Sequence, residues 1–177
     1  KMESIQPNNH SISTIKYKET EPNINEELKI VLGEEYGIVS VTSIAQVQES
    51  EINSNNFRII TPHEIYLLRR NGAGAEERIR KSHNLIAHCK KWGVPIPEII
   101  LSGGQTLIKK QDSIYTVFQF IEGHHFSGSL EELRELGKGV ARLHLALANY
   151  TGEVSPSPPP AIRAYPPYSP EEFEKIR

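Results

Sequence analysis

Several residue types are scarce in this sequence, and each scarcity narrows the class of protein. Its 177 residues include a single cysteine, Cys89, so no disulfide can form within the chain, which favours a reducing compartment such as the cytoplasm. No apolar run approaches the ~18 residues that a membrane-spanning helix requires. The formal net charge of −2 lacks the basic excess that is typical of nucleic-acid and membrane-surface binders. We therefore expect a cytoplasmic protein that binds neither nucleic acid nor membrane.

Short runs of β-branched and aromatic residues predict an antiparallel sheet. Residues 38–48 alternate roughly between apolar and polar side chains, as a strand with one buried face does. Polar turn clusters separate this run from the next two, so that three strands follow one another as a meander. The runs that read as strands cover residues 38–48, 57–60, 65–70, 98–101, 106–109 and 114–121. We expect a sheet of about five strands with one face to cover.

Helical patterns lie on both sides of these runs. Residues 75–92 place their apolar side chains near one side, which predicts a helix packed on the sheet. A shorter helix is expected over residues 26–32. The helix predicted over residues 130–149 begins at a capping box, in which Ser129 is followed three positions later by Glu132.

The two ends of the sequence are less regular. Residues 1–24 are polar and are expected to be irregular. Residues 155–170 contain seven prolines, which favours an extended connector. Pro170 then stands at the start of another helix, which Arg177 cuts short. We expect the sequence to be a piece of a longer protein.

Five segments, in this order, resemble the aminoglycoside phosphotransferase, choline kinase and homoserine kinase family. They are ESEINSNNFRI at 49–59, YLLRR at 66–70, GVPIP at 93–97, VFQFIEG at 117–123 and LGKGVARLH at 136–144. The family has a protein-kinase-like fold. The resemblance implies an α+β kinase-like N-lobe over residues 25–122, after the irregular segment 1–24. Residues 123–177 would then be the hinge exit and the beginning of an incomplete, mostly helical C-lobe.

The same resemblance implies a site for ATP. Arg69 would replace the strand lysine that contacts the nucleotide phosphates, and a guanidinium is a competent phosphate ligand. The alternative for Arg69 is a surface charge on an edge strand. Arg70 is expected to face the other way and to be solvated. Asn53, Ser54 and Asn55 would belong to the loop over the phosphates; because this loop has no glycine, a plain hairpin turn is an equal alternative.

The resemblance also implies a hinge after the last strand. There, the Gln119 carbonyl and the Ile121 N–H would hold the adenine ring. One feature of the family is missing from the sequence. The helix glutamate that pairs with the strand cation would fall near Ser82, His83 or Asn84, none of which is acidic.

Catalytic and metal-binding residues are not found in the sequence. Phosphoryl transfer in this fold needs one aspartate near the substrate hydroxyl and another on the metal, but Asp112 is the only aspartate present. The Mg²⁺ ligands are therefore expected in a missing C-terminal part, and this chain alone is expected to be inactive.

Two interpretations follow. In the first, the sequence is the N-terminal nucleotide-binding portion of an ATP-dependent phosphotransferase. Its substrate would be the hydroxyl group of an amino alcohol, a hydroxy amino acid, a sugar or an aminoglycoside. In the second, the lobe is a non-catalytic nucleotide-binding or protein-interaction scaffold, which the missing glutamate and the glycine-free loop favour. The choice of substrate and any self-association of the incomplete lobe stay open.

Overall fold

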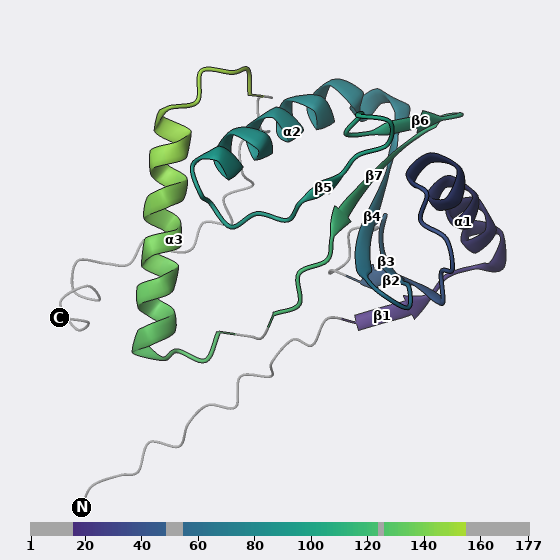
Figure 1. The fold of residues 1–177 in the computed structure, drawn as a ribbon, viewed down its shortest axis with the longest axis horizontal. Helices are drawn as coiled ribbons and strands as arrows, with labels where there is room; N and C mark the ends of the chain where they lie inside the picture. Colours follow the sequence, from purple (N-terminus) through teal and green to yellow (C-terminus); the bar gives the residue numbers. More distant parts are fainter. Residues whose placement is uncertain (1–15, 49–54, 124–125, 155–177) are drawn as a thin grey trace, which may run out of the picture.

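The computed structural model describes residues 16–48, 55–123 and 126–154, which form one seven-stranded antiparallel sheet and three α-helices (Figure 1). The strands are β1 (Lys16–Glu19), β2 (Ser43–Gln48), β3 (Asn56–Ile60), β4 (Ile65–Gly72), β5 (Ile99–Ile100), β6 (Ile108–Lys110) and β7 (Ser113–Gln119). The helices are α1 (Pro22–Tyr36), α2 (Glu76–Lys91) and α3 (Leu130–Ala148), and a 3₁₀ turn, Ala73–Ala75, precedes α2.

The order of the strands places β4 in the interior of the sheet. The order is β1-β2-β3-β4-β7-β5, and β6 also pairs with β7. The strand β4 pairs antiparallel with β3 on one side and with β7 on the other, so Arg69 stands opposite both Asn56 and Thr116. Since Arg69 lies on a central strand, the edge-strand part of the alternative is wrong, but its side chain is exposed, as that alternative expected of a surface charge.

The main hydrophobic core lies between α1 and one face of the sheet. Leu28 and Leu32 of α1 are fully buried against Ile59 and Leu68. The helix is longer than predicted at both ends, because Pro22 occupies its first turn and Gly37 ends it with a left-handed φ of 66°.

The opposite face of the sheet carries α2, so the two helices enclose the sheet from both sides (Figure 1). Ile79 of α2 packs with Leu107 and Ile114 in a second, smaller cluster. Cys89 is 2% exposed, so its side chain is part of the buried apolar interior. We predicted α2 as the one packed helix, but α1 makes the larger core. The smaller cluster leaves part of the sheet face under α2 less filled.

The third helix, α3, lies beside α2 and away from the sheet (Figure 1). A ring nitrogen of His88 lies 2.8 Å from the Ala146 carbonyl oxygen, and Lys81 pairs with Glu153 at 3.0 Å. The predicted capping box of Ser129 and Glu132 is present. Most of the large apolar side chains of α3 are nevertheless exposed, namely Leu130, Leu133, Leu136, Val140, Leu145 and Leu147.

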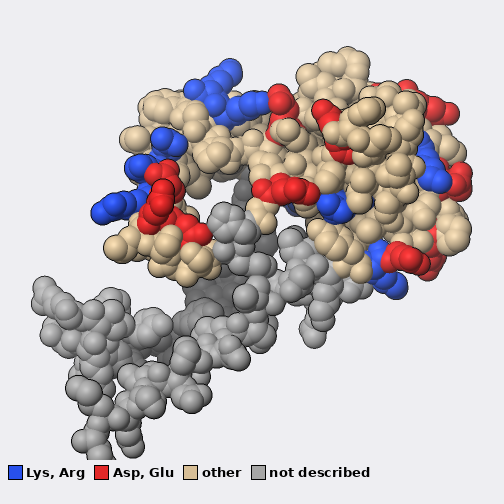
Figure 2. All heavy atoms as spheres, turned by 60° about the horizontal axis from the view of Figure 1, so that its bottom comes forward, with Lys and Arg blue, Asp and Glu red and all other residues tan. Residues whose placement is uncertain are grey.

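The surface shows mixed charge. On the face drawn in Figure 2, the Lys and Arg side chains of the described residues are interspersed with acidic ones rather than gathered in one broad patch. No helix in the described part of the chain is long and apolar enough to cross a membrane.

The sheet has seven strands rather than the predicted five or so. The additional strand β1, with the sequence KYKE, falls within the segment that was predicted to be irregular. Its composition has no run of apolar residues, and it is a strand because it pairs with β2, from Lys16↔Gln48 to Glu19↔Ala45. The proline-rich connector and the helix predicted from Pro170 lie outside the described residues.

Candidate functional site

Arg69 and Arg70 are neighbours in β4 and point to opposite faces of the sheet, because side chains alternate along a strand. Arg70 lies on the α1 face, where it pairs with Glu27 at 3.4 Å and donates to the Ser113 hydroxyl at 3.2 Å. The prediction that Arg70 is solvated is therefore wrong. It is a half-buried partner of α1, and its charge is already compensated.

Arg69 lies on the α2 face. Its Nε donates to the Asn56 side-chain oxygen at 2.9 Å, and its guanidinium carbon lies 5.8 Å from the centre of the Phe118 ring. Among the described residues, no carboxylate lies within ion-pair distance of Arg69. Its positive charge is therefore held in place by neutral groups only.

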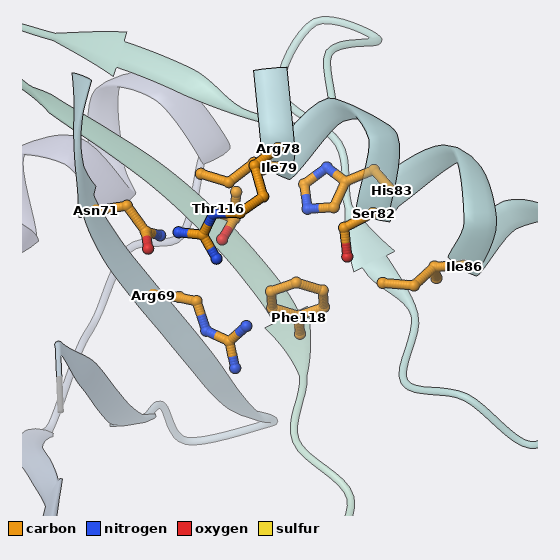
Figure 3. A pocket seen from close by; sticks show the side chains of 9 residues that line it. All are labelled: Arg69, Asn71, Arg78, Ile79, Ser82, His83, Ile86, Thr116 and Phe118. Carbon is orange, nitrogen blue, oxygen red and sulfur yellow. The ribbon is translucent and has the colours of Figure 1, made fainter. Parts of the chain in front are cut away.

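A cavity of about 130 Å³ lies beside Arg69, between α2 and the strands β4 and β7 (Figure 3). Two strands and one helix contribute its walls. The lining residues are Arg69, Asn71, Arg78, Ile79, Ser82, His83, Ile86, Thr116 and Phe118. Figure 3 shows the side chains of the strands and of the helix converging on the same space.

The face of α2 that meets Arg69 has no acidic residue. Ser82 and His83 occupy the positions where the sequence predicted the missing glutamate. The glutamates of the first turn of α2 are engaged elsewhere. Glu76 binds Arg80 and Lys109 at 3.0 and 2.6 Å, and Glu77 binds Lys81 at 2.7 Å. The ion pair between strand and helix is therefore absent from the described residues.

Two buried polar atoms at this cavity have no hydrogen-bond partner in the described structure. They are His83 Nδ1 and Asn71 Nδ2. His83 is only 5% exposed, and its ring meets Phe118 edge-on, with the ring centres 5.9 Å apart. Burial, and then the positive charges of Arg69 and Arg80, lower the pKa of His83 below its ordinary value. The neutral imidazole is thus favoured while the cavity holds no negative charge.

The segment after β7 leaves the sheet beside β3 and β4. The N–H of Gln119 donates to the Glu98 carbonyl at 2.8 Å, and the N–H of Phe120 donates to the Ile65 carbonyl at 3.0 Å. Ile121 is 57% exposed, and no hydrogen bond joins its N–H to a described residue. The Ile121 N–H at the predicted hinge therefore has no hydrogen-bond partner among the described residues.

Arg58 of β3 contacts the same segment after β7. Its guanidinium lies 5.1 Å from the centre of the Phe120 ring, and it pairs with Glu122 at 3.6 Å. The hinge predicted at Gln119–Ile121 therefore lies against the same sheet that carries Arg69.

The predicted phosphate loop is only partly described. Asn53 and Ser54 lie outside the described residues. Asn55 is exposed, and its carbonyl accepts a hydrogen bond from the Arg70 N–H at 2.9 Å. Its neighbour Asn56, rather than Asn55, is the one that binds the Arg69 side chain.

The charged side chains that line the cavity are cationic, since Arg69 and Arg78 both belong to its wall. No group of three or more His, Cys, Asp or Glu side chains gathers within the described ranges. Asp112, the only aspartate, lies in the turn between β6 and β7 and is not part of the cavity wall. A cavity with two guanidiniums and an unpaired amide N–H has the donors that a phosphate accepts.

Sequence reasoning found Arg69 but not the other residues of the cavity. No local pattern singles out Arg78 or Asn71, and the sequence points to His83 only as one of the positions where the family glutamate would fall. One signal was available, since Ile79 and His83 are four residues apart and hence share a helix face. That face had to be matched with β4 and β7, and their pairing is not visible in local patterns.

Comparisons with known proteins agree with this geometry. A sheet with one helix on each face and a cationic strand beside α2 defines a kinase-like small lobe. The sequence profile of the phosphotransferase enzyme family (APH) matches residues 43–174, and the chain belongs to this family. No curated protein sequence gave a significant match.

Two solved structures share the fold. One is the spectinomycin phosphotransferase APH(9)-Ia in complex with ADP and spectinomycin, with 15% identity and a TM-score of 0.59, over 68% of this chain and 37% of that chain. The other is a candidate fructosamine-3-kinase from Haemophilus somnus 129PT, with 13% identity and a TM-score of 0.51, over 66% of this chain and 38% of that chain. The chain therefore spans less than half the length of these two proteins.

Proposed function

We propose that this chain is the nucleotide-binding lobe of a phosphotransferase that transfers the terminal phosphoryl group of ATP to a hydroxyl group of a small molecule. One observation carries the proposal. Arg69 stands on a central strand with its guanidinium beside the α2 cavity and without a described carboxylate partner. In a member of the phosphotransferase enzyme family, such a charge is available to the phosphates of a nucleotide.

The residues around the cavity would divide the binding of ATP between them. Arg69 would neutralise phosphate charge, and Phe118 beneath its guanidinium would limit the orientations that the side chain adopts. The Ile121 N–H and the Gln119 carbonyl would hold the adenine ring, while Asn53, Ser54 and Asn55 would cover the phosphates. Bound ATP would supply the group that is transferred.

The remaining machinery would come from outside this sequence. Asp112 is the only aspartate, and its turn does not line the cavity. We therefore infer that the catalytic aspartate and the Mg²⁺ ligands belong to other parts of the whole protein, and that this chain alone transfers no phosphoryl group. The acceptor would be an amino alcohol, a hydroxy amino acid, a sugar or an aminoglycoside. Spectinomycin in the solved APH(9)-Ia complex supports the last of these classes.

Two variants of adjacent arginines test the proposal. In the full-length protein, Arg69→Ala should weaken ADP binding by about tenfold or more, because a charge-assisted contact to phosphate is lost. Arg70→Ala is the matched control and should leave ADP affinity unchanged, since Arg70 faces α1. Isothermal titration calorimetry measures both affinities. Equal ADP affinity in the wild type and Arg69→Ala would remove Arg69 from the site.

The second interpretation has its own signature. ADP binding that depends on Arg69, without turnover of any hydroxyl acceptor by the full-length protein, would favour the non-catalytic module. The observation that supports this interpretation is the absence of an acidic α2 residue from the described cavity wall beside Arg69.

A further inference from the structure

The α2 side of the cavity brings more positive charge to Arg69 rather than the negative charge expected there. Arg78 lines the cavity from α2, and no described carboxylate forms an ion pair with it. Its neighbours Arg80 and Lys81 are paired with Glu76 and Glu77, so the acids of this helix are already used. Arg69 and Arg78 line one cavity, and both side chains are exposed, so an anion from solution can reach the two guanidiniums and offset their like charges.

The polar atoms left without partners lie at the same cavity. Buried polar groups in folded proteins nearly always have a hydrogen-bond partner, and an orphaned group indicates an unseen water, ion or ligand. His83 is 5% exposed with an unpartnered Nδ1, and Asn71 Nδ2 is an unpartnered donor. Figure 3 shows the Arg78 side chain extending from α2 toward Asn71 on β4, with the Arg69 guanidinium beside Phe118 and the His83 ring on the α2 side of the same cavity.

The size of the cavity fits a small anion. Its volume of about 130 Å³ is several times the ~30 Å³ that one water occupies in the liquid, so a tetrahedral oxyanion can enter. Ile79, Ile86 and Phe118 supply an apolar part of the wall.

We propose that this cavity is an oxyanion site for a phosphoryl group, bound by Arg69 and Arg78 and by the amide of Asn71, with His83 in its wall. The bound anion takes the place of the absent helix carboxylate and neutralises the strand arginine directly. The inference deepens the proposed function, on which it rests for the source of the phosphoryl group, a nucleotide rather than free phosphate.

His83 makes the binding depend on pH. It faces Arg69 from β4 and the edge of Phe118 from β7, with Arg78 and Arg80 on its own helix, and none of these groups is acidic. An anion beside the ring offsets these positive charges and raises the pKa of His83. Binding therefore takes up a proton, and affinity increases as the pH falls toward the ordinary pKa of histidine.

The first test compares two arginines on different helices. Inorganic phosphate and ADP are titrated by calorimetry into the full-length protein and into Arg78→Gln, Arg78→Lys and Arg134→Gln. We expect Arg78→Gln to weaken both ligands by about tenfold, Arg78→Lys to retain part of the affinity, and Arg134→Gln, on exposed α3, to match the wild type. Wild-type affinity in Arg78→Gln would overturn the proposal.

The second test adds the missing acid. Ser82→Glu places a carboxylate at the cavity, where it would pair with the arginines and compete with the anion. We expect it to abolish phosphate binding and to weaken ADP. If the site only lacked its family ion pair, the same substitution would strengthen ADP binding, and that result would contradict the proposal.

Further measurements separate this inference from the proposed function. Adenosine carries no phosphate, so Arg78→Gln should bind it as the wild type does. If ADP and adenosine bind equally well to the wild type and to Arg78→Gln, the oxyanion site fails and the nucleotide site stands. If phosphate binds through Arg78 but neither ADP nor adenosine binds, the oxyanion site stands and the nucleotide function fails. NMR of the His83 imidazole should show its pKa rising with phosphate, and an unchanged pKa would count against the site.

Discussion

The two faces of the sheet treat adjacent arginines in opposite ways. On the α1 face, Arg70 meets Glu27 and Ser113, and the surrounding side chains form the larger hydrophobic core. On the α2 face, the described contacts of the Arg69 side chain are with Asn56 and the ring of Phe118, beside a cavity with unpaired polar atoms. On the α1 face the arginine has a carboxylate partner. On the α2 face the arginine has no described carboxylate partner.

We interpret this difference as one between a charge that holds the fold together and a charge that is left for the proposed ligand. An arginine whose charge is met by a carboxylate holds two elements together and has little left for a ligand. An arginine held by an amide oxygen and an aromatic ring keeps its position as well as its free charge. Neither property follows from residue type, because the two arginines are identical and consecutive in the sequence.

The largest expected effect is a loss of stability from a substitution in the hydrophobic core between α1 and the sheet. Leu68 is fully buried against α1, so Leu68→Ala should lower the free energy of unfolding by about 2–5 kcal/mol. The matched change on the α2 face, Ser82→Ala, removes an exposed hydroxyl and should change it by no more than about 0.5 kcal/mol. Urea denaturation of both variants gives the comparison. Similar losses in the two would mean that the faces are equally packed.

A smaller effect on stability is expected from the ion pair between Arg70 and Glu27. A double-mutant cycle with Arg70→Ala and Glu27→Ala should give a coupling free energy of about 0.2–1 kcal/mol, because both side chains are partly exposed and solvent screens the pair. ADP affinity should be the same in all four proteins of the cycle. If ADP affinity decreased in the variants that are less stable, the Arg70–Glu27 pair on the α1 face would contribute to nucleotide binding on the α2 face, which would contradict this prediction.

The smallest expected effect is the pH dependence of stability that His83 causes on the α2 face of the sheet. The pKa of His83 is lowered in the folded protein, so at acid pH the unfolded chain binds more protons than the folded one. Stability should therefore decrease as the pH falls below the ordinary histidine value of about 6.5, and it should be fully present above it. His83→Asn, which cannot titrate, should flatten this part of the stability profile. Saturating phosphate should flatten it in the wild type too.

The sequence predicted the elements whose residues carry their own pattern. The apolar runs at 57–60 and 65–70, which became β3 and β4, and the capping box at Ser129 are local signals, and the structure confirms these elements. Local signals failed for β1, which has no apolar run and exists through its pairing with β2. The start of α1 at Pro22 was not predicted. A proline in a polar stretch is compatible with irregular structure as well as with the first turn of a helix, so the sequence did not distinguish the two.

What the sequence determined by itself was the order of strands and helices, the family resemblance and the candidacy of Arg69. Periods of two and 3.6 residues, caps and turn residues are properties of short stretches, so they are readable without the fold. Tertiary structure alone decided that α1 makes the main core, that Arg70 is paired, and that Arg78, Asn71 and His83 meet beside Arg69. These outcomes depend on which segments pair across long distances in the sequence, and such pairings are fixed by packing the whole sheet between its helices.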